Sequence, residues 1–309
     1  RRDYRRRIEV GKQGIVLIDK PEGITSRKAL DKVMAILKVK RAGHFGTLDP
    51  FATGLLCIGL GQGTKLLPFM NEQEKEYVAT IGFDMCTDTD DITGTPIERF
   101  DNVSIDIGKA ISWFDQHKGW IDQLPPRYCA QKVNGKPLYR LTRANQDVQP
   151  RRKKVFIEST EILDYGADWI KARITCSRGT YIRSIARDLG ISLGYGGYLR
   201  ELRRFRSEGF HIDDAMSLSA LEEKLSAGKD VVIPLSSAVH MPKVRVTRTG
   251  ESAILDGNPI QVSWLLDKVE VSQGGYVAMV NTDMQLLCIA RSQPCAGIWG
   301  YIERGFRPY

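Results

Sequence analysis

The most informative stretch of the sequence is GHFGTLDPFATGLL, residues 43–56. Glycines flank His44, and they permit tight turns and the close approach of a ligand to the backbone. Pro50 fixes the backbone directly after Asp49. A carboxylate held in such a rigid turn is well placed to act as a nucleophile or a general base. An Asp before Pro is also a common turn former, so this stretch alone leaves a catalytic and a purely structural interpretation open.

The hydrophobic pattern on both sides of this stretch predicts strands and helices in turn. Residues 14–19 form a short apolar strand that Pro21 terminates, and Thr25 or Ser26 can cap the helix that follows. A second glycine-rich turn is expected at residues 61–63. In the first 240 residues we expect strands over residues 14–19, 77–83 and 169–176, and helices over residues 25–39, 105–116 and 181–193.

The texture of the sequence changes near Met241. Beyond this residue, short β-prone pieces are separated by turn residues, which is typical of a small β domain. We therefore expect two domains, over residues 1–240 and 241–309. Within the larger one, residues 124–154 contain paired prolines, an Asn-Gly pair and many cations, which predicts an insertion with turns of its own.

The net charge of +8 is concentrated in three segments. Residues 127–154 carry a net charge of +8, residues 178–206 of +5 and residues 1–12 of +4, so the rest of the chain is acidic, at −9. Aromatic side chains, including Tyr128 and Tyr139, are interleaved with these cations. Because cations bind phosphates and aromatic faces stack on unpaired bases, we expect RNA as the partner. For any one segment, a solvated surface is the simpler alternative.

Other classes of function are excluded by what the sequence lacks. No apolar run approaches the roughly 20 residues that cross a bilayer, and no secretory signal is visible. The six cysteines are scattered without metal-ligand spacing, which suits a reducing cytoplasm. The acidic loop at residues 84–91 is no calcium-binding EF-hand, because the twelfth position from Asp88 is Arg99. Nucleotide-binding and serine-nucleophile motifs are also absent, so an enzyme here would work with side chains alone.

A partner for Asp49 is available in the stretch CSRGTYIRS, residues 176–184. An arginine beside a buried aspartate keeps the carboxylate ionised at neutral pH and orients it. Arg183 is the natural candidate for this role. The alternative is that Arg183 is a surface cation at the start of a helix.

Four stretches together resemble the motifs of the bacterial TruB family, tRNA pseudouridine-55 synthases. Besides residues 43–56, they are LIDKPEG at 17–23, KEY at 75–77 and GTYIRS at 179–184. The segment LPPRYCA at 124–130 resembles that family's RNA-gripping insertion, and LDGNPI at 255–260 resembles part of a PUA domain. The resemblance implies an α/β (α+β) pseudouridine synthase fold, with a mixed, largely antiparallel central sheet and flanking helices. A small PUA-like β-barrel would follow it.

The resemblance also implies an activity, the isomerisation of uridine 55 in the T-loop of tRNA to pseudouridine. The uridine would be flipped into the pocket, and Asp49 would act as the nucleophile, on either the base or the sugar carbon. No guide RNA, metal or other cofactor is implied. The expected protein is a cytoplasmic monomer that binds the T-arm stem-loop, with neither a membrane nor an obligate protein partner.

Positions that match the family's motifs supply the rest of the predicted site. Tyr181 would contact the base and move a proton, and Arg183 would pair with the nucleophile. Leu202 would form an apolar wall, and His44 would fill the space that the flipped base vacates. The residues implied in substrate binding are His44, Tyr77, Leu202 and Lys20. Without the order of the motifs, we would interpret most of these residues as structural ones.

Two positions depart from the family's common pattern. Phe45 stands where Thr or Gly is more usual, and Cys129 replaces a frequent Ser; both are expected near RNA-facing surface. Two other readings of the sequence stay open. One is the guide-RNA-dependent relative of archaea and eukaryotes, against which the basic insertion argues. The other is an RNA-folding factor without turnover, against which the intact Asp49, Tyr77, Tyr181 and Arg183 argue.

Overall fold

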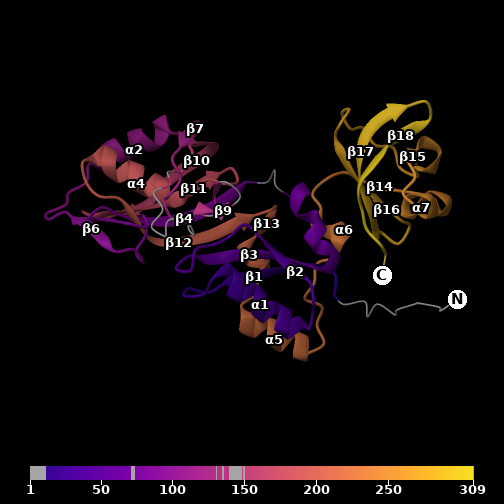
Figure 1. The fold of residues 1–309 in the computed structure, drawn as a ribbon, viewed down its shortest axis with the longest axis horizontal. Coiled ribbons are helices and arrows are strands. Elements are labelled where there is room, and N and C mark those ends of the chain that lie inside the picture. Colours follow the sequence, from indigo (N-terminus) through magenta and orange to yellow (C-terminus); the bar gives the residue numbers. More distant parts are fainter. Residues whose placement is uncertain are drawn as a thin grey trace.

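A computed structural model describes residues 12–70, 74–129, 131–133, 136–138, 148 and 150–308 of the protein. Its main feature is a nine-stranded sheet (Figure 1). The strands are β1 (Gly14–Lys20), β2 (Ala42–Phe45), β3 (Thr53–Leu60), β4 (Lys75–Gly82), β7 (Gly119–Gln123), β10 (Lys153–Tyr165), β11 (Trp169–Cys176), β12 (Tyr198–Ser207) and β13 (Phe210–His211).

The order of the strands in this sheet is β1-β3-β12-β4-β11-β10-β7, with β2 paired to β3 and β13 to β12. All of these pairs are antiparallel except β12 with β3, which is parallel. The expected mixed, largely antiparallel sheet is therefore confirmed. Two short hairpins stand apart from it, β5 (Met85–Thr87) with β6 (Pro96–Arg99) and β8 (Lys132–Val133) with β9 (Lys136–Pro137).

Helices pack on the sheet in two groups, as Figure 1 shows. They are α1 (Ser26–Leu37) with α5 (Leu218–Ser226), and α2 (Ile107–Gln116) with α4 (Ile182–Leu193); the single turn α6 (Leu235–Ala238) belongs to neither group and packs near β1. α1 and α5 cover β1 and β3, whereas α2 and α4 cover β4, β10 and β11. The hydroxyl of Thr25 caps α1 as predicted, because it accepts a hydrogen bond from the backbone N–H of Lys28 at 3.0 Å.

The predicted turn at residues 61–63 is wrong. These residues open a 3₁₀ helix, η1 (Gly61–Phe69), in which the Thr64 hydroxyl donates to the carbonyl of Gly61 at 2.8 Å. Leu66 of this helix is fully buried. The local glycine pattern does not reveal that the segment continues as a helix and buries this side chain.

The sequence pattern did not predict two long strands, β10 and β12, because both are rich in charged residues. β12 lies between β3 and β4 in the sheet, and two of its arginines are paired with acids from distant strands and loops. Arg203 lies 2.7 Å from Asp19, and Arg200 lies 2.6 Å from Asp168. Since these partners are remote in sequence, local alternation of apolar and polar residues could not predict the strand.

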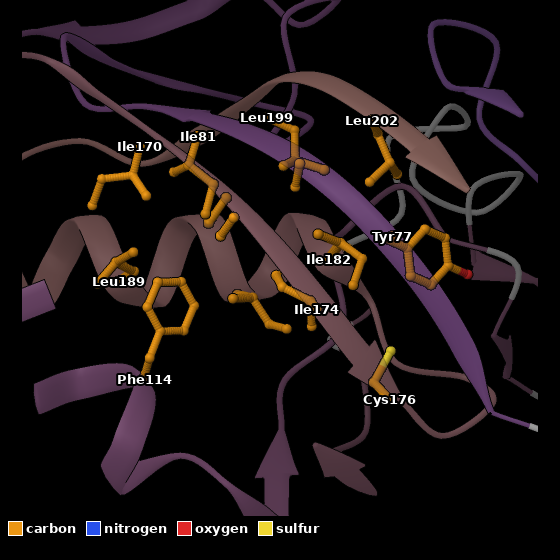
Figure 2. Packing of buried hydrophobic residues seen from close by; sticks show 14 of the residues in the cluster. Tyr77, Ile81, Phe114, Ile170, Ile174, Cys176, Ile182, Leu189, Leu199 and Leu202 are labelled. Atoms are coloured by element: carbon orange, nitrogen blue, oxygen red, sulfur yellow. The ribbon is translucent and has the colours of Figure 1, made fainter. Parts of the chain in front are cut away.

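One hydrophobic core fills the space between β4, β11, β12 and α4. Figure 2 shows its aliphatic side chains packed between the sheet and the helix, with Tyr77 and Leu202 at one end. The ring of Tyr77 carries its hydroxyl away from the packed aliphatic residues. This end of the core is where the cavity described below opens.

A second, five-stranded sheet begins after residue 240, in the order β14-β16-β17-β18-β15. Its elements are β14 (Lys243–Arg245), α7 (Arg248–Leu255), β15 (Ile260–Gln261), the 3₁₀ turn η3 (Val262–Trp264), β16 (Tyr276–Val280), β17 (Leu286–Cys295) and β18 (Ile298–Gly305). The expected small β unit is therefore present. One buried cluster spans both sheets, since Ile15 and Phe45 of the body belong to it together with Ile289 and Phe306. Within the described residues, no helix has the length and apolar character needed to cross a membrane.

Candidate active site

A cavity of about 760 Å³ lies beside the loop that follows β2. Five of the seven predicted site residues line it, although they come from positions far apart in the sequence. They are Asp49, Tyr77, Tyr181, Arg183 and Leu202. The two remaining predicted residues, His44 and Lys20, are not among the residues that line this cavity.

The loop that carries Asp49 is anchored on both sides of the aspartate. On one side, the Ser26 hydroxyl donates to the carbonyl of Leu48 at 3.0 Å and accepts from the Leu48 N–H at 2.8 Å. On the other side, the carbonyl of Pro50 accepts from the Lys20 ammonium at 3.3 Å. These contacts fix the residues before and after Asp49, and so hold its carboxylate in place.

Lys20 therefore supports the loop from below. It is fully buried, and its ammonium also donates to the carbonyls of Pro21 and Ile24, at 2.9 and 2.8 Å. Burial lowers the pKa of Lys20 to about 8, although the nearby Asp49 carboxylate opposes the shift. The contacts of Lys20 are thus to backbone carbonyls, and they join the turn after β1 to the loop of Asp49.

Arg204, which the sequence did not single out, joins the two ends of the same loop. It is fully buried in β12, and its guanidinium donates to the carbonyl of Gly46 at 3.1 Å and to that of Leu55 at 2.8 Å. Gly46 has a φ of +73°, and a Cβ there would lie 2.5 Å from the Lys75 ammonium and 3.3 Å from Arg204. Glycine at this position lets the loop backbone rest directly on two cations.

The predicted pair of Asp49 and Arg183 is present. Nε of Arg183 lies 3.1 Å from Oδ2 of Asp49, and Nη2 lies 3.5 Å from Oδ1. Arg183 is 7 % exposed and Asp49 is 35 % exposed. The carboxylate therefore faces the cavity, while its partner is almost enclosed by protein.

A further acid behind Arg183 was not identified from the sequence. Asp91 lies 3.3 Å from Nη1 of Arg183 and is 5 % exposed. It also accepts from the hydroxyls of Thr89 and Thr93 at 2.9 and 2.6 Å. The only sequence signal for it was the acidic loop at residues 84–91, in which Asp90 pairs separately with Arg187 at 3.0 Å. Two carboxylates of that loop are therefore paired with arginines of α4.

The surroundings of Asp49 act on its pKa in opposite directions. Burial raises the pKa of Asp49 above its ordinary value, the Arg183 guanidinium lowers it, and the nearby Asp91 raises it again. Burial has the largest effect, so the net shift is upward. Arg183 therefore offsets only part of the increase that burial causes in the pKa of Asp49.

Tyr181 stands at the first turn of α4, and its backbone is clamped by one side chain. Gln123 accepts from the Tyr181 N–H at 2.8 Å and donates to its carbonyl at 3.1 Å. Burial is the main cause that raises the pKa of Tyr181 above its ordinary value, and the neighbouring Cys129 adds to the effect. The phenol accordingly keeps its proton at neutral pH. Cys129, one of the departures from the family's pattern, lines the same cavity.

Tyr77 and Leu202 lie on adjacent strands, β4 and β12, and each is 8 % exposed. Their side chains lie at one end of the hydrophobic core, as Figure 2 shows, and both line the cavity. An aromatic face and an aliphatic wall suit the stacking of a planar base.

His44 lies on β2, one residue before Phe45 at the end of the strand. Its ring is half-buried, and Nδ1 has no hydrogen-bond partner within the described part of the chain. Burial, together with the nearby Arg204 and Arg27, lowers the pKa of His44, so the ring is neutral at pH 7. The basic residues 1–11 and Tyr139 lie outside the described residues, as does most of the insertion between 134 and 149.

Comparisons with known proteins find relatives of this chain over most of its length. The family model for the TruB family pseudouridylate synthase N-terminal domain matches residues 34–182, and that for the tRNA pseudouridylate synthase B C-terminal domain matches residues 183–240. The tRNA pseudouridine synthase B of Geobacter sulfurreducens is 35 % identical over 301 residues, covering 95 % of this chain and 97 % of that protein. The enzyme of the same name from Aromatoleum aromaticum is 40 % identical over 248 residues, covering 79 % and 80 %.

Solved structures show the same fold. A chain of an H/ACA ribonucleoprotein bound to a substrate RNA has a TM-score of 0.74 at 23 % identity, covering 96 % of this chain and 85 % of that one. A chain of the archaeal box H/ACA Nop10–Cbf5 complex has a TM-score of 0.73 at 24 % identity, covering 98 % and 89 %. These similar structures confirm the predicted fold class. The relatives found by sequence establish the family, and the chain belongs to the TruB family of pseudouridylate synthases.

Proposed function

We propose that this protein is a tRNA pseudouridine synthase that isomerises uridine 55 of the T-loop without a guide RNA. The observation that carries the proposal is the Asp49–Arg183 pair at 3.1 Å, set in a cavity with Tyr77, Tyr181 and Leu202. The relatives named tRNA pseudouridine synthase B support tRNA as the substrate, since they cover up to 95 % of the chain.

The reaction needs only groups that this cavity holds. The bond between N1 of the uracil and C1′ of the ribose breaks, the ring turns, and a bond between C5 and C1′ forms. The C5 proton is lost and N1 gains a proton, so the atoms balance without a co-substrate. In our proposal, Asp49 is the nucleophile, on either the base or the sugar carbon, and Arg183 favours its ionised form and orients it.

The other residues of the cavity bind the base. Tyr77 stacks on the uracil, and Leu202 forms an apolar wall of the pocket. Tyr181 retains its phenolic proton at neutral pH, and so it is suited to donate a hydrogen bond to the base and to pass on a proton. His44, outside the cavity, occupies the space in the RNA that the flipped uridine leaves.

The remaining expectations complete the proposal. Flipping the uridine costs roughly a few kcal/mol, which stacking and phosphate contacts offset. Residues 1–240 then form the synthase domain and residues 241–309 a PUA-like RNA-binding domain. The protein acts in the cytoplasm as a monomer, without an obligate protein partner.

The experiment is pseudouridine formation on an unmodified T-arm stem-loop by the purified protein, with no guide RNA. We expect product with the wild type, none with Asp49→Asn, and nearly equal RNA affinity for both. Turnover by Asp49→Asn would overturn the assignment of the nucleophile. Tight binding without product by the wild type would favour a guide-dependent enzyme or an RNA-folding factor instead.

A further inference from the structure

A cluster of four cations lies where the two sheets meet, outside the catalytic cavity. We call it the junction cluster, and it consists of Arg41, Lys65, Arg304 and Arg307. Its members come from three separate parts of the chain: the residue before β2, the helix η1, and the end of β18 with the residues after it. None of them lines the catalytic cavity.

Backbone contacts hold these segments together in a defined arrangement. The carbonyl of Arg41 accepts from the Gly61 N–H at 2.8 Å. Gln62 accepts from the Arg307 N–H at 2.9 Å and donates to the Arg307 carbonyl at 2.8 Å. The ammonium of Lys65 donates to the carbonyl of Gly305 at 2.9 Å. Two loops and a helix are therefore tied at one place, where the exposed Arg41, Arg304 and Arg307 are close enough to act electrostatically on Lys65.

Hydrophobic packing fixes the same junction from below. Phe306 is 2 % exposed and lies under the Lys65 ammonium, at 5.5 Å from ring centroid to nitrogen. Phe69, at the end of η1, meets Tyr276 of the second sheet edge to face at 5.4 Å. The junction cluster therefore lies beside a packed aromatic contact between the two sheets.

Like charges gathered in this way destabilise the fold unless an anion compensates them. Within the described part of the chain, none of the four side chains forms an ion pair with a carboxylate. Burial lowers the pKa of Lys65, and the three arginines lower it further. Two of the three N–H donors of Lys65 are used by Gln62 and Gly305, which leaves one for a ligand.

The position of the cluster indicates which anion compensates these charges. Arg41 directly precedes β2, and the loop of Asp49 begins at Gly46, just after the strand. At about 3.3 Å per residue, the strand separates the cluster from this loop by roughly 15 Å. A substrate that fills the cavity with one nucleotide continues beyond it as a chain of phosphates, and arginines recognise phosphates with paired donors.

We propose that the junction cluster binds the sugar–phosphate backbone of the tRNA at a place remote from the flipped nucleotide. This rests on the proposed function for the identity of the RNA. The cluster adds affinity and helps to orient the tRNA on both sheets at once. It makes no contact with the reacting atoms, so its contribution lies in binding and not in the chemical step.

The test replaces Arg41, Arg304 and Arg307 with Gln together in the full chain. Lys65 stays, because its ammonium also ties the junction. The matched control replaces Lys109, Lys224 and Lys229 with Gln, which removes the same charge from exposed positions on α2 and at the end of α5. Binding of unmodified full-length tRNA is measured at several salt concentrations, and turnover on the same tRNA is measured in parallel.

For the junction variant we expect about tenfold weaker tRNA binding, and a salt dependence whose log–log slope is smaller by about 2 to 3. KM should rise while kcat at saturating tRNA stays unchanged. Equal affinity and equal slope in the junction and control variants would overturn the proposal, as would a loss of kcat without a loss of binding. Wild-type turnover tests the proposed function separately, since the binding measurement does not depend on it.

A second measurement guards against a purely structural role for the arginines. Without RNA and at low salt, removal of like charges should leave the thermal midpoint of the junction variant unchanged or raise it. The addition of tRNA should then stabilise the wild type more than the variant. A lower midpoint of the free variant would show that the arginines hold the junction together, and would overturn the proposal.

Discussion

Arg183 and Asp91 form an ion pair at 3.3 Å, in which the guanidinium is 7 % and the carboxylate 5 % exposed. The same guanidinium reaches Asp49 at 3.1 Å on its other side, and it donates to the carbonyls of Thr89 and Tyr128 at 2.9 Å. Arg183 therefore has no freedom to turn away from Asp49. The orientation of the proposed nucleophile is set by an acid that lies in a different loop.

We expect Asp91→Asn to slow pseudouridine formation by about 100-fold, because a misplaced Arg183 no longer orients Asp49. RNA affinity should change little, since Asp91 is buried behind the arginine. The rate of single-turnover product formation checks this. Asp90→Asn is the matched control, because Asp90 pairs with Arg187 and not with Arg183. Equal rates for the two variants would contradict the positioning role.

The dependence of the rate on pH should respond to Arg183. Burial raises the pKa of Asp49 and Arg183 lowers it, so Arg183→Gln should raise that pKa further. Because the ionised carboxylate is the reactive form, the acid limb of the single-turnover pH–rate profile should move to higher pH. Arg187→Gln, which removes a cation that pairs with Asp90 and Asp188, should leave the limb in place. A shift to lower pH would be inconsistent with the pairing.

Asp49→Asn should stabilise the folded protein at pH 7. The folded state holds Asp49 with a raised pKa, so its ionised form disfavours folding at pH values above that pKa. The gain should shrink as the pH falls, since the native carboxyl then becomes protonated. Thermal unfolding at several pH values checks the direction, with the exposed Asp101→Asn as the control. A decrease in the midpoint at pH 7 would show that ionised Asp49 supports the fold.

Gly46→Ala should be more damaging than Gly228→Ala. Both glycines have positive φ, +73° and +68°, so each substitution costs about 1 kcal/mol of backbone strain. A Cβ at Gly228 meets nothing within 4 Å, whereas one at Gly46 would press on Lys75 and Arg204. We expect a further loss of about 1–3 kcal/mol for Gly46→Ala and a lower rate of product formation. Denaturant unfolding measures the difference between the two variants in the free energy of unfolding. Equal losses would show that the loop does not rest on these cations.

The basic residues at the end of the insertion should contribute to RNA binding. Replacing Arg151, Lys153 and Lys154 with Gln should weaken tRNA binding and reduce its salt dependence by about 2 to 3 in slope. Arg152 is kept, because its guanidinium donates to the carbonyl of Asp122 at 3.0 Å. The control triple variant of Lys109, Lys224 and Lys229 applies here too. An unchanged slope would show that this segment does not meet phosphate.

Much of the fold could be predicted from the sequence, because the signals were local. The strand at Trp169–Cys176 alternates apolar and polar residues, and Thr25 caps α1; both are properties of neighbouring residues. β12 was missed because two of its arginines, Arg200 and Arg203, pair with the acids Asp168 and Asp19, which lie far along the chain. The 3₁₀ helix η1 was missed because its glycines suggest a turn, whereas the segment continues to Phe69 and buries Leu66.

By itself, the sequence determined the family and the residues that we propose for the site, since motif order and spacing are properties of the sequence. It identified Asp49 and Arg183, but Asp91 and Arg204 became visible only in the tertiary structure. The physical reason is that an isolated aspartate or arginine in a sequence is as typical of a solvated surface as of a buried network. Only folding decides which charges leave water, and a charge that has left water must be paired.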